Sequence, residues 1–164
     1  MTDIQKLHHS AYRCRDSEAT RAFYEDFLGL HLVNAFEISA TKSGRETRVL
    51  HSFFAMADGS CLAFFEVPDQ PFEFKDQHDF DLHIALEVDY PTLESMLEKG
   101  RTQGIDTRGI SDHGFIHSIY FRDPNGYVVE LTAQVEERSG ALEPGAARDA
   151  LDAWQRSKPG ANLQ

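Results

Sequence analysis

The hydrophobic and polar positions of the first half predict one helix among four strands. Gly29 follows apolar residues at helical spacing, so we expect a helix over about 17–28, capped by Asp16 or Ser17. Turn signals stand at 43–44 and 58–59. Four segments around them are rich in β-branched and aromatic residues: 8–14, 30–38, 48–56 and 60–67. The order is strand, helix, three strands.

The second half repeats this order. Pro91 suits the first turn of a helix, which we expect over about 91–101. The turn Asp123-Pro124-Asn125-Gly126 precedes the final strand, as Asp58-Gly59 precedes the fourth. Four strand-like segments flank these features: 81–88, 104–108, 115–122 and 127–133. Self-similarity of this kind indicates two modules that close a core only together.

We therefore predict an α+β fold with two βαβββ modules, at about 4–68 and 78–134, in one domain over 1–134. Residues 135–164 form an extension of different composition. Its part from 136 to 145 is polar and predicted as loop, whereas 146–156 predicts a short helix that carries Trp154. We expect this helix to pack on the domain or on a second subunit.

Composition and charge narrow the classes of function. The formal net charge of −11 and pI near 5.1 argue against nucleic acid, whose phosphates need clustered Lys and Arg. The chain shows no apolar signal core at its start and no membrane-length apolar run, so we expect a cytoplasmic protein. In that reducing compartment Cys14 and Cys61 are expected to be free thiols rather than a disulfide.

Strand alternation brings candidate metal ligands together. His9 opens the first strand of module one, His83 opens that of module two, and Glu130 lies in the last strand. A carboxylate among apolar neighbours needs a cation, hydrogen-bond donors or solvent. Two imidazoles and one carboxylate form the ligand set of non-haem iron(II) oxygenases. The alternative for each residue alone is a hydrogen-bonded core or rim side chain.

Three segments stand out as motifs: 8–16 (HHSAYRCRD), 22–30 (AFYEDFLGL) and 121–131 (FRDPNGYVVEL). Together they resemble the vicinal oxygen chelate superfamily, which includes glyoxalase I, extradiol dioxygenases, fosfomycin-resistance proteins and bleomycin-binding proteins. The resemblance covers residues 4 to about 134. It implies that the paired modules form a half-open, mixed β-barrel around a metal, with the helices outside.

The same resemblance implies His9, His83 and Glu130 as metal ligands. Glyoxalase I enzymes use a fourth ligand, at the position that Ala63 occupies here. Glu66 could replace it only if a bulge shifted the strand register. The three-ligand pattern resembles the extradiol dioxygenases, so iron(II) is the expected metal, with manganese, nickel and zinc as alternatives.

Tyr120 precedes Glu130 by ten residues, a spacing that resembles the tyrosine of extradiol dioxygenases that contacts a catecholate oxygen. It could equally be an ordinary strand aromatic. That family keeps an acid–base histidine nearby, and His113, in a turn, can point inward. His117 has the wrong strand parity relative to Tyr120.

Three hypotheses for function follow. The first is ring cleavage of a catechol-like small molecule by dioxygen, in an iron(II) enzyme that we expect to be a homodimer. The second is a glyoxalase-like isomerase or thiol-adduct enzyme with Glu66 as fourth ligand. The third is a metal-free protein that binds a hydrophobic drug. The acidic run around His78, which includes Asp79, is expected to be a solvated loop.

Overall fold

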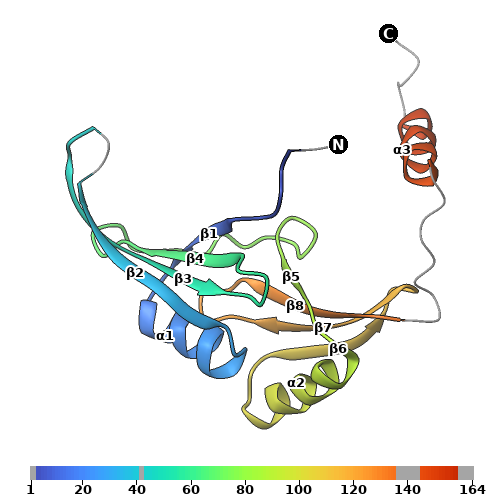
Figure 1. Cartoon of the computed structure of the whole chain (residues 1–164), viewed down its shortest axis with the longest axis horizontal. Coiled ribbons are helices and arrows are strands. Elements are labelled where there is room, and N and C mark those ends of the chain that lie inside the picture. The colour runs from blue at the N-terminus through green and yellow to red at the C-terminus, as the bar shows by residue number, and fades with distance from the viewer. Residues whose placement is uncertain (1–2, 41–42, 136–144, 159–164) are drawn as a thin grey trace.

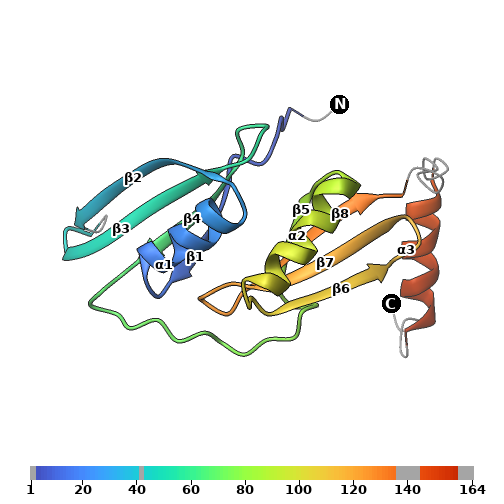
Figure 2. The same cartoon turned by 90° about the horizontal axis from the view of Figure 1, so that it is seen from below.

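The computed structural model describes residues 3–40, 43–135 and 145–158, and Figures 1 and 2 show its elements. The strands of the first module are β1 (His9–Cys14), β2 (His31–Ala40), β3 (Glu46–Ala55) and β4 (Cys61–Glu66). Its helix begins as α1 (Ser17–Arg21) and continues as the π-helical segment η1 (Ala22–Phe27). The second module comprises β5 (Ile84–Glu87), α2 (Tyr90–Thr102), β6 (Thr107–Asp112), β7 (Ile116–Arg122) and β8 (Val128–Gln134). A final helix, α3, spans Ala146–Ser157.

Both modules have the same topology. The strand orders are β1-β4-β3-β2 and β5-β8-β7-β6. In each sheet the first strand pairs in parallel with the last, and the remaining pairs are antiparallel. The predicted α+β class and the two βαβββ modules are confirmed. The described residues form two separate sheets, and they close no barrel.

Side-chain caps explain where the two module helices start. The Asp16 carboxylate accepts a hydrogen bond from the backbone N–H of Ala19 at 2.7 Å. Asp89 accepts one from Thr92 N–H at 2.8 Å, with Pro91 in the first turn of α2. Each cap satisfies a backbone donor that the helix itself leaves without a partner. Both helices therefore begin within a residue or two of the positions predicted from the sequence.

The predicted strand at 104–108 is displaced, because β6 begins only at Thr107 and continues to Asp112. Residues 103–105, which precede β6, form the turn that ends α2. Gly104 adopts a left-handed φ of 69°, and the N–H of Ile105 donates to the carbonyl of Gly100 at 2.9 Å. The chain therefore leaves the helix later than the turn signals predicted.

Aromatic packing and one buried polar network join the two modules. The rings of Phe27 and Phe121 meet edge to face, with centroids 5.0 Å apart. The fully buried Tyr24 donates its hydroxyl to Asp123 at 3.0 Å, and Asn125 of the same turn donates to Thr20 at 3.2 Å. The turn Asp123-Pro124-Asn125-Gly126 of the second module is thus hydrogen-bonded to the helix of the first.

This packing uses one face of each sheet. In the first sheet Tyr24 packs on Phe64, with ring centroids 4.6 Å apart. The neighbouring side chain of Ala63 points to the opposite face, which it shares with His9, because β1, β4 and β3 pair in continuous register. We call this the His9 face. In the second sheet Glu130 pairs with Tyr120 on β7, and we call the face that these two share the Glu130 face.

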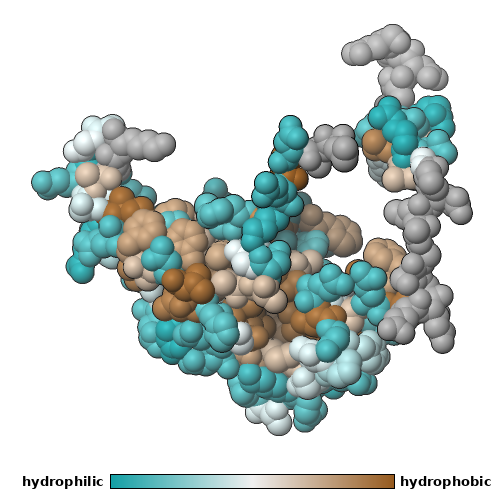
Figure 3. Space-filling view, viewed as in Figure 1, coloured by the Kyte–Doolittle hydropathy of each residue, from teal (hydrophilic) through white to brown (hydrophobic). Residues whose placement is uncertain are grey.

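The remaining surface has two apolar features. Figure 3 shows apolar side chains over the part of the molecule where β2 and β3 lie. The exposed large apolar residues of these strands are Leu32, Val33, Phe36 and Leu50. Helix α3 stands apart from both sheets in Figure 1, with Leu151 and Trp154 exposed. Its predicted existence is confirmed, whereas residues 136–144 of the loop predicted at 136–145 lie outside the described residues.

No helix among the described residues is long and apolar enough to cross a membrane. Both cysteines are free thiols, as expected, and burial raises the pKa of the Cys14 thiol.

Candidate functional site

His83 and Glu130 meet on the second sheet with their metal-binding atoms facing each other. The Nδ1 of His83 lies 2.8 Å from the carbonyl oxygen of Asp79. Because a carbonyl can only accept, Nδ1 carries a proton, and in the neutral imidazole Nε2 then keeps its lone pair. That Nε2 lies 3.4 Å from Oε2 of Glu130, whose side chain is 8% exposed. Adjacent ligands of one octahedral ion with bonds of about 2.1 Å are separated by about 3 Å, so the pair fits a shared divalent metal.

Tyr120 and His113 join this pair. Tyr120 lies directly opposite Glu130 in the register of β7 and β8, and His113 Nε2 is 2.8 Å from the Tyr120 hydroxyl. Burial raises the pKa of the Tyr120 phenol, and the nearby carboxylate of Glu130 raises it further. The phenol is therefore held protonated near neutral pH. His117 points away, as its parity predicted, and its ring packs against Tyr90.

Two residues of this site were missed in the sequence. The Arg108 guanidinium lies over the Tyr120 ring, 5.4 Å from its centroid, and its terminal nitrogen is 2.7 Å from the Asp79 carboxylate. This guanidinium holds the pKa of the Asp79 carboxyl below its usual range. Asp79 also supplies the carbonyl that orients His83. The expected solvated loop is confirmed at 76–81, and within it the Asp79 side chain, 33% exposed, also pairs with Arg108.

Arg108 lies opposite Tyr120 in the register of β6 and β7, and this pairing is what marks it as a site residue. The predicted strand ended at Arg108, so its pairing with β7 could not be inferred from the sequence.

His9 lies on the other sheet, among aromatic rings. Its ring is 5.5 Å from Phe53 and 6.3 Å from His51, and its Nδ1 is 2.7 Å from Nδ1 of His8. His51 stacks on Phe65 with centroids 3.7 Å apart. Across the described ranges, no three His, Cys, Asp or Glu side chains of one chain come close enough to hold a metal ion. A single copy thus brings together four of the five predicted site residues and leaves His9 apart.

The fourth-ligand question has a direct answer in the geometry. Ala63 is fully buried on the His9 face, opposite Ala11 on β1 and Phe53 on β3. The pairing of β4 is continuous through Glu66, without a bulge. Glu66 therefore faces the helix side, where its Oε2 accepts a hydrogen bond from Ser17 N–H at 2.7 Å. It is not positioned to bind a metal beside His9.

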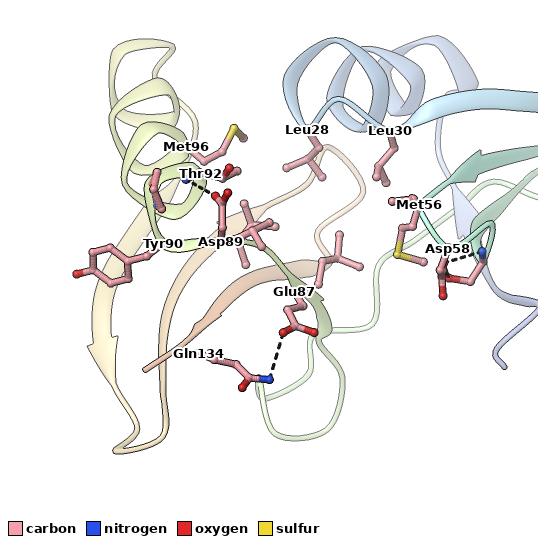
Figure 4. A pocket seen from close by; sticks show the side chains of 16 residues that line it. Leu28, Leu30, Met56, Asp58, Glu87, Asp89, Tyr90, Thr92, Met96 and Gln134 are labelled. Carbon is pink, nitrogen blue, oxygen red and sulfur yellow. Dashed lines mark hydrogen bonds between the residues drawn. The ribbon is translucent and has the colours of Figure 1, made fainter. Parts of the chain in front are cut away.

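A cavity of about 1020 Å³ lies at the junction of the modules (Figure 4). Its apolar lining includes Leu28, Leu30, Met56 and Met96. None of the described residues that line it is a histidine. At its edge the Gln134 amide donates to the Glu87 carboxylate at 3.2 Å, a pair that Figure 4 draws. The cavity therefore lies mainly on the helix side of the second sheet, where Leu86 and Leu131 point, and its lining does not include His83 or Glu130.

Comparison with known proteins agrees with this fold. The fosfomycin resistance protein FosX of Listeria monocytogenes, in complex with Mn(II) and sulfate, is 21% identical, with a TM-score of 0.60 over 82% of this chain and 97% of that one. A glyoxalase/dioxygenase from Nostoc punctiforme is 23% identical, with a TM-score of 0.59 over 82% and 94%. A glyoxylase/bleomycin resistance protein/dioxygenase domain from Frankia sp. EAN1pec is 16% identical, with a TM-score of 0.65 over 81% and 100%. Similarity at this level shows the fold alone.

No curated protein of known function matches the sequence. One family model does match, over residues 6–131, which include both modules except for the end of β8. The chain belongs to the Glyoxalase/Bleomycin resistance protein/Dioxygenase superfamily.

Proposed function

We propose that the chain is a metal-dependent enzyme whose site is shared between two copies. His9 of one copy and the pair His83 and Glu130 of a second would hold one divalent metal. The observation that carries the proposal is the Nε2–Oε2 distance of 3.4 Å in the pair, with the Nδ1 of His83 fixed by a carbonyl. A histidine that binds a metal through one ring nitrogen usually donates the N–H of the other to a carbonyl or carboxylate, as His83 does here.

The need for a second copy comes from His9. Its face of the first sheet is not covered by this chain's own helix, which packs on the opposite face. Phe36 of β2, which is exposed, lies opposite His51 in the strand register and so adds an aromatic ring to the His9 face, and exposed apolar surface of this kind marks interaction sites. In a homodimer, the His9 face of one copy would meet the Glu130 face of the other. This pairing would cover the exposed apolar surface and would bring His9 to the His83–Glu130 pair.

The proposed reaction is extradiol ring cleavage of a catechol-like diol. Iron(II) with three protein ligands would supply open positions for the two oxygens of a diol and for dioxygen. Ala63, at the fourth position, leaves such a position open, which disfavours the isomerase alternative with Glu66 as ligand. Retention of the His83–Glu130 pair disfavours a metal-free drug-binding protein.

Tyr120 and His113 would serve the substrate. The protonated Tyr120 hydroxyl can donate a hydrogen bond to a substrate oxygen and so orient the diol. His113, at 2.8 Å from that hydroxyl, can take the proton of the second substrate hydroxyl as a general base. Phe53 beside His9 offers an apolar wall for an aromatic ring.

A second candidate function rests on Arg108. Its guanidinium at the site would suit an anionic substrate, and one structure of the Listeria FosX protein contains Mn(II) and 1S,2S-dihydroxypropylphosphonic acid. By analogy, an oxygen-independent reaction of a phosphonate with manganese is the alternative. The two candidates differ in whether dioxygen is consumed.

The test uses protein purified without oxygen and reconstituted with Fe(II) or Mn(II). Oxygen uptake and ring-cleavage absorbance are measured with a panel of catechols, and fosfomycin turnover is measured without oxygen. We expect iron-dependent uptake with the catechols. His113→Ala should lower kcat by about 10²–10⁴-fold, whereas the matched control His117→Ala should change it little. Turnover of fosfomycin alone would replace the dioxygenase proposal, and metal-independent binding without turnover would refute both.

A further inference from the structure

The two imidazoles of the proposed site are held in different ways. The Nδ1 of His83 faces a backbone carbonyl, which can only accept a hydrogen bond. The Nδ1 of His9 faces the Nδ1 of His8 at 2.7 Å, with the ring planes at 75°. A second imidazole can either donate or accept. The tautomer of His83 is therefore fixed by the main chain, whereas that of His9 depends on a side chain.

The short distance between the two Nδ1 atoms requires one proton between them. If His9 Nδ1–H donates to His8, then Nε2 of His9 keeps a free lone pair. If His8 Nδ1–H donates instead, neutral His9 carries its proton on Nε2 and cannot bind a metal through that atom. Only the first arrangement is competent for metal binding through Nε2.

The main chain holds the two rings near each other. The carbonyl of His8 accepts a hydrogen bond from the N–H of Cys61 at 3.1 Å, and Cys61 is the partner of His9 in the β1–β4 register. Among the described residues, His8 is the hydrogen-bond partner of the His9 ring. The parallel pairing that opens the first sheet thus places His8 as the orienting neighbour of His9.

We propose that His8 is a positioning residue for the metal, which accepts the hydrogen bond of His9 Nδ1–H and so presents His9 Nε2 to the ion. The inference rests on the proposed function, because it takes His9 as a ligand. Removal of an outer partner of a metal-bound histidine typically lowers metal affinity about 10–100-fold. The other described rings in contact with His9 do not offer the same role: Phe53 has no hydrogen-bonding atom, and the Nδ1 of His51 is already bonded to the carbonyl of Phe64.

The first measurement is Mn(II) affinity of the full chain without oxygen, for wild type, His8→Ala and His8→Asn. The expected loss for His8→Ala is about 10–100-fold. His8→Asn should stay within about 3-fold of wild type, because its amide oxygen accepts the same hydrogen bond without adding charge. Rescue by Asn separates orientation of His9 from mere packing, because His8 is exposed and both variants remove its ring.

The second measurement is nitrogen-15 NMR of the histidine rings in metal-free protein, at a pH where the imidazoles are neutral. We expect the Nδ1–H tautomer of His9 in wild type and in His8→Asn, and a mixture of tautomers in His8→Ala. The Nε2–H form of His9 in wild type would overturn the inference, as would unchanged metal affinity in His8→Ala.

His9→Ala separates this inference from the proposed function. If His9→Ala loses the metal while His8→Ala keeps it, the inference about His8 fails and His9 remains a ligand. If His9→Ala binds Mn(II) like wild type, the shared site itself is refuted.

Discussion

Two variants that each lack the metal site are expected to restore it when mixed. His9→Ala removes the ligand proposed on the first sheet, and Glu130→Ala removes one of the two proposed on the second. In a site shared between copies, a heterodimer of these variants combines the intact His9 of one chain with the intact His83 and Glu130 of the other. The second site of that heterodimer lacks both groups.

The expected magnitude follows from the two-fold arrangement. Random pairing makes about half of the dimers heterodimers, and each heterodimer has one intact site of two, so about one quarter of the wild-type sites return. Heterodimers isolated with two different affinity tags should reach about one half. Metal content by elemental analysis and metal-dependent turnover should agree with these fractions.

A matched control uses His83→Ala with Glu130→Ala. Both ligands lie on one sheet, 3.4 Å apart, so every possible pairing lacks one of them, and no site should return. The variants are mixed after unfolding and refolded together so that the chains exchange. Absence of recovery in the His9→Ala and Glu130→Ala mixture, despite isolated heterodimers, would refute the shared site. Recovery in the control mixture would refute the assignment of both ligands to the same half.

Two further predictions concern residues outside the metal pair. Glu66→Gln should leave Mn(II) affinity nearly unchanged, and an affinity loss equal to that of Glu130→Gln would contradict this. The same variant should lower the free energy of unfolding by less than about 1 kcal/mol, because the amide oxygen can still accept the hydrogen bond from Ser17 N–H. Tyr24→Phe should lower the free energy of unfolding by about 1–3 kcal/mol, because it removes the buried hydroxyl that donates to Asp123. Denaturant titrations should show a larger loss of unfolding free energy for this variant at pH 7 than at pH 4. An equal loss at both pH values would contradict a link between the Tyr24 hydroxyl and the ionisation of Asp123.

The sign of that pH effect follows from Asp123. Burial raises the pKa of its carboxyl above the usual value, and the hydrogen bond from Tyr24 opposes the rise. A raised pKa in the folded state gives stability that is present below the unfolded pKa of about 3.9 and is lost as pH rises through the folded pKa. Without the Tyr24 hydroxyl the folded pKa rises further. The loss then continues over a wider range, so the variant falls further behind wild type at the higher pH.

Local sequence patterns predicted what depends on local geometry. The repeat, the two capped helices and the opposite orientations of Tyr120 and His117 all follow from periodicity, because a period of two or of 3.6 fixes which side chains share a face. Glu66 illustrates the same rule, since its parity relative to Ala63 places it on the helix side unless a bulge intervenes.

What the patterns could not predict depends on tertiary arrangement. Asp79 binds Arg108 across 29 residues of sequence, and no local signal links them. The separation of His9 from His83 has the same origin. The sequence places each histidine at the start of its module, but the way the modules pack decides whether the two starts meet within one chain.

The free edges of the sheets have a consequence for solubility. β1 pairs with β4 and β5 pairs with β8, and in the described residues each of these opening strands has a strand on one side only. An uncovered strand edge presents backbone donors and acceptors that can recruit other chains indiscriminately. If two copies pair as proposed, a copy without its partner exposes two such edges, next to His9 and His83. Variants with a weakened interface should accumulate as aggregates rather than as well-behaved monomers.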